Sequence, residues 1–113
     1  MTLFSVPLLR LTAAYAIGSP YFSPEVPTGY VWVVRDIAGL GGSLPDDEIA
    51  VAIDEGDGSL VYFYAWSDAD SSAFNNTFHW KGRQVLDAGE RLRVDVDGGG
   101  IWLAASGYQL STP

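Results

Sequence analysis

His79 is the only histidine in the chain, and it opens the stretch HWKGRQVLDAGERLRV (residues 79–94), which also carries four cations. Imidazole is the side chain best suited to move protons near neutral pH. Catalysis by a serine hydroxyl would need this imidazole beside a serine on a strand–turn–helix elbow, and the sequence has no such pattern. A metal centre would need several histidines or a surrounding cluster of carboxylates. We therefore interpret His79 as a strand residue and expect that the chain is not an enzyme.

Acidic residues gather in four short segments, at residues 46–48, 54–57, 68–70 and 95–97. A glycosidase needs two carboxylates that face each other across a cleft, and no pattern in the sequence indicates such a pair. Residues 54–59 have a faint likeness to a calcium loop, but the downstream bidentate glutamate is missing at loop spacing. Turn formation and solubility explain these acids well. We expect no cofactor, with a structural calcium ion as the alternative.

The cations of the opening stretch are Lys81, Arg83, Arg91 and Arg93, which gather in one region of an acidic chain. One interpretation is cross-strand pairing with the nearby acids Asp87, Glu90, Asp95 and Asp97. The other is a docking surface for an acidic neighbour.

The composition limits the possible functions. The chain of 113 residues fits one domain and has a net charge of −8, which is a poor match for nucleic-acid phosphates. It has no cysteine, which excludes thiolate zinc sites, thiol catalysis and disulfides. No stretch reaches the roughly 18 apolar residues of a membrane span. The fold must therefore rest on core packing, a structural ion or partner subunits.

Hydrophobic residues alternate with a period of two along most of the chain, as they do in β-strands. The clearest cases are residues 30–37, 49–53, 60–66 and 92–96, which are separated by a loop at residues 39–47 and by turns at 55–58 and 87–90. In the last turn Gly89 is suited to a positive φ, and a return strand follows it. This spacing predicts an all-β fold, a single antiparallel β-sandwich of jelly-roll or TNF-like type with about seven to eight strands. We expect one domain, with an N-terminal strand or arm at residues 1–25 and the sandwich core at residues 26–113.

The chain has more aromatic residues than the core of one thin sandwich should bury. In the strand at residues 60–66, alternation places Val61, Phe63 and Ala65 toward the core. It leaves Leu60, Tyr62, Tyr64 and Trp66 on the other side, and Trp32 also falls on the side away from the core in its own strand. Either the core is well filled with some ordinary exposed apolar atoms, or a neighbouring subunit covers a second apolar face.

Three stretches in this order and spacing resemble small β-sandwich proteins encoded among the tail genes of bacteriophages, especially phages of actinobacteria. They are VPTGYVWVVRDI (residues 26–37), WKGRQVLDAGERLRV (residues 80–94) and ASGYQL (residues 105–110). The resemblance to these minor tail proteins implies a virion structural role without catalysis. It implies that eight residues hold the fold or a subunit contact: Trp80, Gly82, Arg83, Gly89, Glu90, Ser106, Gly107 and Tyr108.

We therefore predict a non-catalytic virion protein, in the tail rather than the capsid, that packs against copies of itself and other virion proteins. Trp32, Tyr62, Tyr64 and Trp66 join the eight residues above as candidates for the fold or a contact. One alternative is a protein that decorates the capsid. Another is a carbohydrate-binding or receptor-binding module that stacks host-surface glycans on Trp66, Trp102, Tyr62 and Tyr64. We expect neither nucleic acid as a partner nor insertion into a membrane.

Overall fold

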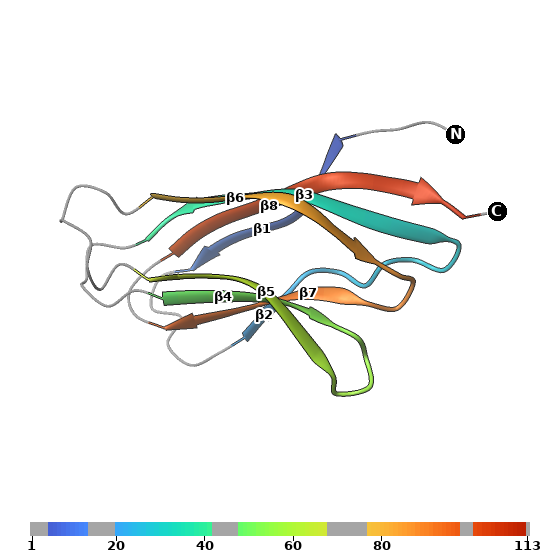
Figure 1. Cartoon of the computed structure of the whole chain (residues 1–113), viewed down its shortest axis with the longest axis horizontal. Helices are drawn as coiled ribbons and strands as arrows, with labels where there is room; N and C mark the ends of the chain where they lie inside the picture. Colours follow the sequence, from blue (N-terminus) through green and yellow to red (C-terminus); the bar gives the residue numbers. More distant parts are fainter. Residues whose placement is uncertain (1–4, 14–19, 42–47, 68–76, 98–100, 113) are drawn as a thin grey trace.

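Two antiparallel sheets face each other in the computed structural model (Figure 1). It describes residues 5–13, 20–41, 48–67, 77–97 and 101–112, with the backbone alone for residues 5–13 and 101. The strands in these ranges are β1 (Ser5–Ala13), β2 (Pro20–Phe22), β3 (Tyr30–Leu40), β4 (Glu48–Asp54), β5 (Leu60–Ser67), β6 (Thr77–Leu86), β7 (Arg91–Asp97) and β8 (Ile101–Ser111).

The strand order is β1–β8–β3–β6 in one sheet and β2–β7–β4–β5 in the other. Two sheets of four strands connected in this order form a jelly roll, which is built from two Greek keys. The predicted fold class, a single antiparallel β-sandwich of jelly-roll type, is confirmed. β1 and β2 lie at the outer edges of their sheets, so the first 25 residues contribute a strand to each sheet.

The core lies between the sheets and is built from alternate residues of the inner strands. The predicted inward positions of β4 and β7 are confirmed, since Val51, Leu92 and Val94 are fully buried. Ile37 of β3 and Leu103 of β8 meet them from the other sheet. Each fully buried aliphatic side chain stabilises the fold by about 1.5–3 kcal/mol relative to an exposed position.

Two predicted turns are confirmed. Between β4 and β5, Gly56 and Gly58 have φ angles of 86° and 94°, and the Glu55 amide donates to the Ser59 carbonyl over 3.0 Å. Between β6 and β7, Gly89 has a φ of 87°, a region that favours glycine. The Glu90 amide donates to the Asp87 carbonyl, and the Asp87 amide donates to the Glu90 carboxylate, which closes this turn.

The strand after Gly89 does not return alongside β6. β6 pairs with β3, whereas β7 pairs with β2 and β4 in the opposite sheet. The turn at residues 87–90 therefore crosses from one sheet to the other. The Gly89 amide donates to the Val26 carbonyl over 2.9 Å, and buried Val26 fills the space beneath this crossing.

The predicted facing of β5 is wrong for Tyr64 and Trp66. Both rings pack against the core, while Ala65 is exposed. The cause is a register shift, in which Val51 lies opposite Tyr64 and the next residue, Ala52, lies opposite Tyr62. This β-bulge reverses the alternation beyond Phe63, which also packs against the core.

β3 differs from its prediction in two ways. Trp32 and Val34 face the core, so Trp32 does not lie on a second apolar face. The strand also extends through Gly39 and Leu40, which were predicted to begin a loop at residues 39–47. Residues 42–47 lie outside the described residues, as do the acidic residues 68–70.

Candidate functional site

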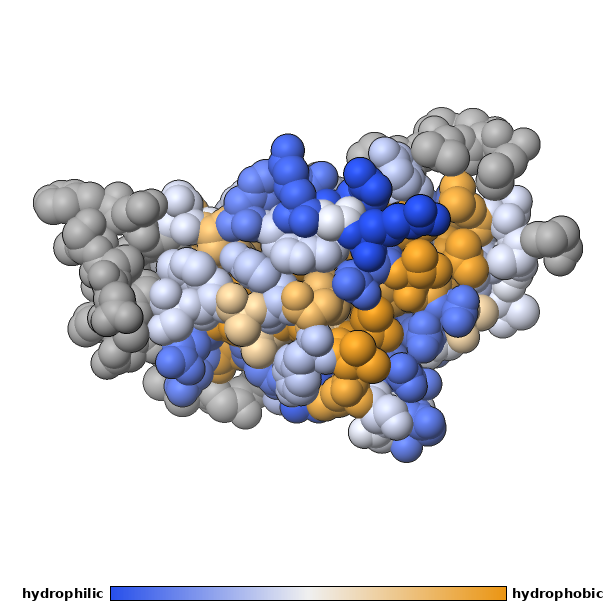
Figure 2. Space-filling view, viewed as in Figure 1, coloured by the Kyte–Doolittle hydropathy of each residue, from blue (hydrophilic) through white to orange (hydrophobic). Residues whose placement is uncertain are grey.

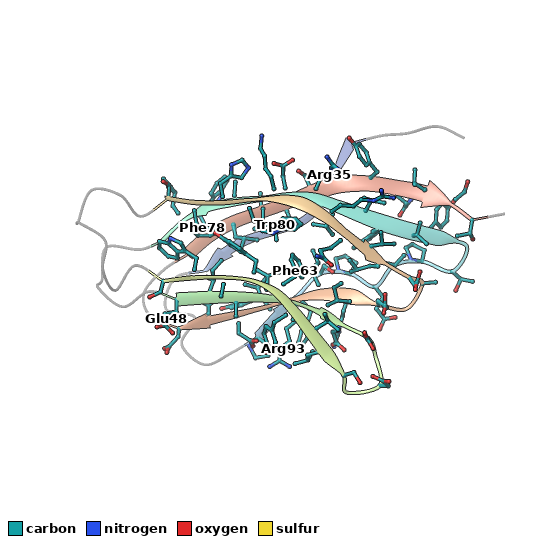
Figure 3. The ribbon with its side chains drawn as sticks, in the orientation of Figure 1. Arg35, Glu48, Phe63, Phe78, Trp80 and Arg93 are labelled. Carbon is teal, nitrogen blue, oxygen red and sulfur yellow. The ribbon has the colours of Figure 1, made fainter. Side chains whose placement is uncertain are left out.

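Five aromatic rings join the two sheets along the β5–β6 edge, and we call this group the aromatic seam. Its members are Phe63, Tyr64, Trp66, Phe78 and Trp80. The ring centroids of Phe63 and Trp80 lie 5.1 Å apart, and those of Trp66 and Phe78 lie 5.0 Å apart. Figure 3 shows Phe63, Phe78 and Trp80 pointing into the space between the sheets. Three of the five rings belong to β5, the strand whose facing sequence alternation alone does not sort correctly, and the rings pack between the two sheets.

Two glycines named by the sequence resemblance allow close packing. A Cβ on Gly82 would lie 2.5 Å from the Trp80 ring, which crosses over this glycine. A Cβ on Gly107 would lie 1.9 Å from the Val33 carbonyl oxygen, because β8 and β3 approach closely there. Gly89 and Glu90 lie in the crossing turn, where Gly89 takes a positive φ and the Glu90 carboxylate accepts a hydrogen bond from the Asp87 amide.

Trp32 has a structural partner. Its Nε1 donates a hydrogen bond of 2.9 Å to the Gln109 side chain, which satisfies the buried indole. Tyr108 lies opposite Val33 on the outer side of the sheet and is half-buried, and Ser106 lies opposite Asp36.

The lone histidine lies on an open sheet face. His79 Nε2 lies 2.9 Å from Asp36 Oδ1, and both side chains are about half exposed, at 50% and 43%. Ser106 of β8 lies opposite Asp36, and it makes no hydrogen bond to the His79 imidazole. Within the described residues, the arrangement lacks the serine–histidine contact that hydroxyl activation requires.

The outer face of the β2–β7–β4–β5 sheet carries two arginine–carboxylate pairs. Arg91 Nε donates to Asp54 Oδ2 over 3.1 Å, and its guanidinium lies 3.7 Å from the centroid of the Phe22 ring. Arg93 contacts Asp95 Oδ1 at 3.0 Å, and the Tyr62 hydroxyl donates to Asp95 Oδ2 over 2.8 Å. Figure 3 places Arg93 outside this sheet.

These contacts shift the ionisation of three groups on this face. The Gly56 amide and the Arg91 guanidinium lower the pKa of Asp54. The hydrogen bond to the Asp95 carboxylate raises the pKa of Tyr62, and the same carboxylate raises the pKa of Arg93. The contacts thus favour the charged forms of Asp54 and Arg93 and the neutral form of Tyr62. Within the described residues, no group of three or more His, Cys, Asp and Glu side chains is placed to hold a metal ion.

The proposed calcium segment has another role in the structure. Asp54 Oδ1 accepts a hydrogen bond from the Gly56 amide, and Asp57 Oδ1 accepts one from the Ser59 amide. The carboxylates thus cap the amides of the β4–β5 turn, which is the usual work of aspartate in turns.

A shallow hollow of about 630 Å³ lies at the other end of the same face. Ala50 and Ala65 line it together with the acids Glu48, Asp95 and Asp97. Glu48 lies directly opposite Asp97 on the neighbouring strand, and both are exposed. Like charges in this position are unfavourable, and neither acid forms an ion pair within the described part of the chain.

The predicted single cluster of cations is wrong. Because the turn at residues 87–90 crosses between the sheets, Lys81 and Arg83 lie on one sheet while Arg91 and Arg93 lie on the other. Of the predicted acidic partners, only Asp95 pairs with one of these cations, and Asp54 takes the other arginine. Lys81 and Arg83 form no ion pair with any residue that the structure describes.

The four rings of the predicted glycan platform are separated as well. Trp66 and Tyr64 pack against the core, while Tyr62 lies on the outer face of one sheet. Trp102 is 49% exposed on the outer side of the other sheet, where it lies opposite Leu40. No shared surface for stacking a sugar ring joins them.

Exposed apolar side chains gather on the side of the sandwich formed by β5 and β6. Figure 2 shows them as a band that crosses from the lower sheet to the upper one. Val61 of β5 and Val85 of β6 are 46% and 45% exposed, and Leu60 and Phe63 are half-buried beside them. We call these four residues the apolar band. Large exposed apolar patches are typical of contact surfaces in proteins, and none of these four residues was among the site residues predicted from sequence.

No helix in the described ranges has the length and apolar character needed to cross a membrane.

No protein-family model matches the chain, and no curated protein matches it. Among solved structures, the chain is similar to the Drosophila NLP core, whose crystal structure gives insight into pentamer formation and histone binding. The two share 12% sequence identity with a TM-score of 0.53, over 96% of this chain and 98% of that one. The likeness supports the fold.

Proposed function

We propose that this chain is a non-catalytic structural subunit of a bacteriophage virion, in the tail, that works by packing against copies of itself and other virion proteins. The observation that carries this proposal is the uncharged edge strand β5 with the apolar band beside it. The setting in a phage tail rests on the resemblance of residues 26–37, 80–94 and 105–110 to minor tail proteins.

Apart from its β-bulge, β5 lacks the usual protection of an edge strand. Among the described strands it pairs only with β4, and its sequence LVYFYAWS has neither a charged residue nor a proline. Soluble proteins usually place charges or prolines on such edges to prevent strand addition. β6, at the corresponding edge of the other sheet, does carry Lys81 and Arg83. A strand of the β5 kind, with its own exposed Val61 and with exposed Val85 of β6 beside it, is suited to a permanent contact.

Size-exclusion chromatography with light scattering tests the proposal. We expect the purified chain to exceed the monomer mass as its concentration rises. Val61→Asp should shift it toward the monomer, since it places a charge in the apolar band, whereas the uncharged β-branched Val61→Thr should keep the larger mass. A strict monomer at the highest concentration, without binding to other virion proteins, would contradict an assembly role.

The genes beside the coding sequence test the setting. A neighbouring tape-measure gene would favour the tail, and a neighbouring major capsid gene would favour capsid decoration. Neighbours of neither kind would count against a virion protein.

A second candidate function is the binding of a strongly basic protein. The hollow lined by Glu48, Asp95 and Asp97 favours it, as does the likeness in fold to a protein associated with histone binding. Titration of the chain with core histones tests this candidate. Saturable binding that Glu48→Lys abolishes would support it, and absence of binding at low salt would exclude it.

A further inference from the structure

We propose that copies of this chain dock head to tail, with the outer face of the β1–β8–β3–β6 sheet of one copy on the outer face of the β2–β7–β4–β5 sheet of the next. This inference rests on the proposed function as an assembly subunit and specifies the partner and the contact. It follows from the opposite charges of the two outer faces and from the apolar side chains exposed on each.

The first of these surfaces, which we call the cationic face, carries Arg35, Lys81 and Arg83. All three are exposed, and none forms an ion pair within the described residues. Figure 3 places Arg35 on the outer side of its sheet, and Lys81 lies beside it opposite Asp36. Asp36 is the one acid on the described part of this face, and its carboxylate contacts His79. In a chain with a net charge of −8, a face with an excess of positive charge needs an explanation.

The second surface, which we call the acidic face, carries Glu48, Asp54, Asp95 and Asp97. Its two arginines are already bound, Arg91 by Asp54 and Arg93 by Asp95. Two carboxylates, Glu48 and Asp97, are left opposite each other at the rim of the hollow. A cation placed between them would relieve their repulsion.

The apolar side chains of the two faces fit the same contact. Leu40 and Trp102 on the cationic face are about half exposed, and Phe22 and Tyr62 on the acidic face are 38% and 53% exposed. Apolar side chains among complementary charges are typical of a protein interface. The small floor of the hollow, formed by Ala50 and Ala65, leaves room for long side chains such as Lys81 and Arg83.

The charges identify the partner as a second copy. An acidic surface that matches the cationic face is present on the chain itself, on the opposite side of the sandwich. A contact between two different faces of identical subunits is heterologous, so each added copy presents the same free face again. Such a contact forms a closed ring or an open stack, both of which suit a multicopy particle.

Two charge-reversal variants test the contact. Lys81→Glu/Arg83→Glu makes both faces acidic, and Glu48→Lys/Asp97→Lys makes both faces basic. We expect each variant alone to form a smaller species than the wild type, with self-association weakened by at least about 100-fold. An equimolar mixture should recover the wild-type size, because the acidic faces of one variant then meet the basic faces of the other.

The control is Glu25→Lys/Asp87→Lys, which changes the net charge as much as Glu48→Lys/Asp97→Lys does, at exposed positions outside both faces. It should keep the wild-type size. Circular dichroism and thermal unfolding check that every variant is folded. The wild-type assembly should also shrink when the salt concentration rises from about 0.05 M to about 0.5 M, since salt screens exposed charges.

The outcomes separate this inference from the proposed function. Variants that each keep the wild-type size would overturn the docking of these faces and leave assembly through the β5–β6 edge. Folded variants that shrink alone but do not assemble when mixed would show that both faces affect self-association without meeting each other, which overturns the head-to-tail contact. A wild-type chain that stays monomeric would overturn both proposals.

Discussion

The Tyr62 hydroxyl reaches across the width of β4 to the Asp95 carboxylate on β7, where it donates a hydrogen bond of 2.8 Å. The reach is possible because the residues of β4 beneath it are Ala50 and Ala52, which lie opposite Asp95 and Arg93. Two methyl groups thus let side chains from the strands on either side meet above β4. In β4, alanine alternates with Ile49, Val51 and Ile53. The branched side chains pack into the core, and the small alanine side chains lie on the outer face.

We predict that Tyr62→Phe lowers the free energy of unfolding by about 0.5 kcal/mol, because the bond it removes is largely exposed. Since the pKa of Tyr62 is raised, this contribution is present at neutral pH and is lost as the pH rises above the ordinary tyrosine value of 10.0. Urea unfolding of both proteins across this pH range measures it. Ala65→Ser, an exposed change on the same strand, is the control and should show no such dependence on pH.

Asp54→Asn should destabilise the protein by about 1 kcal/mol at neutral pH, because it removes the charge that Arg91 and the Gly56 amide stabilise. The pKa of Asp54 is lowered, so its contribution is present above the unfolded value of 3.8 and is lost as the pH falls through the lower folded value. Thermal unfolding between neutral and acidic pH should show the two melting curves converge in acid. Ala65→Ser, which removes no carboxylate, should give a difference that does not change with pH; convergence there as well would refute the assignment to Asp54.

Gly107→Ala should cost about 3 kcal/mol or more, because its Cβ would meet the Val33 carbonyl oxygen and neither backbone can move aside. Ser106→Ala on the neighbouring residue should change the stability by less than about 0.5 kcal/mol. Denaturant unfolding compares the two. Equal stabilities would show that β8 and β3 do not approach so closely.

Phe78→Ala should lower the stability by about 3–5 kcal/mol, because it empties the centre of the aromatic seam between Tyr64 and Trp66. His79→Ala, the next residue on the opposite face, should cost less than about 1 kcal/mol, since its contact with Asp36 is exposed. Near-ultraviolet circular dichroism should lose intensity only in Phe78→Ala. A large loss in His79→Ala would give the histidine a structural role that its exposure does not suggest.

Local patterns predicted the strands and turns well. The alternation of Leu92, Val94 and Val96 with polar residues gave β7 its correct inner face, and Gly89 takes the positive φ expected from its turn. These features depend on a few adjacent residues, which is the range over which side-chain alternation and turn chemistry act.

Features that depend on distant strands were not predictable. The β-bulge near Phe63 is a shift of one residue in the pairing of β4 with β5, and no residue type in β5 indicates it. The sheet to which β7 belongs was not predicted, for a similar reason. A turn such as Asp87–Glu90 fits a hairpin or a crossing equally, and the choice depends on which strands β7 can pair with. The opposite charges of the two outer faces follow from that choice.

The place of β8 between β1 and β3 has a consequence for synthesis on the ribosome. Ser5 lies opposite Tyr108, so the earliest described strand finds its neighbour only when one of the latest has emerged. Before β8 is synthesised, β3 can pair with β6, and β4 can pair with β5 and β7. β1 has no strand to pair with until β8 has emerged. Contacts so remote along the chain slow folding. We expect the nascent protein to carry an unpaired amino-terminal strand through most of translation, which makes that interval the time when it is most open to chaperones and to association with other nascent chains.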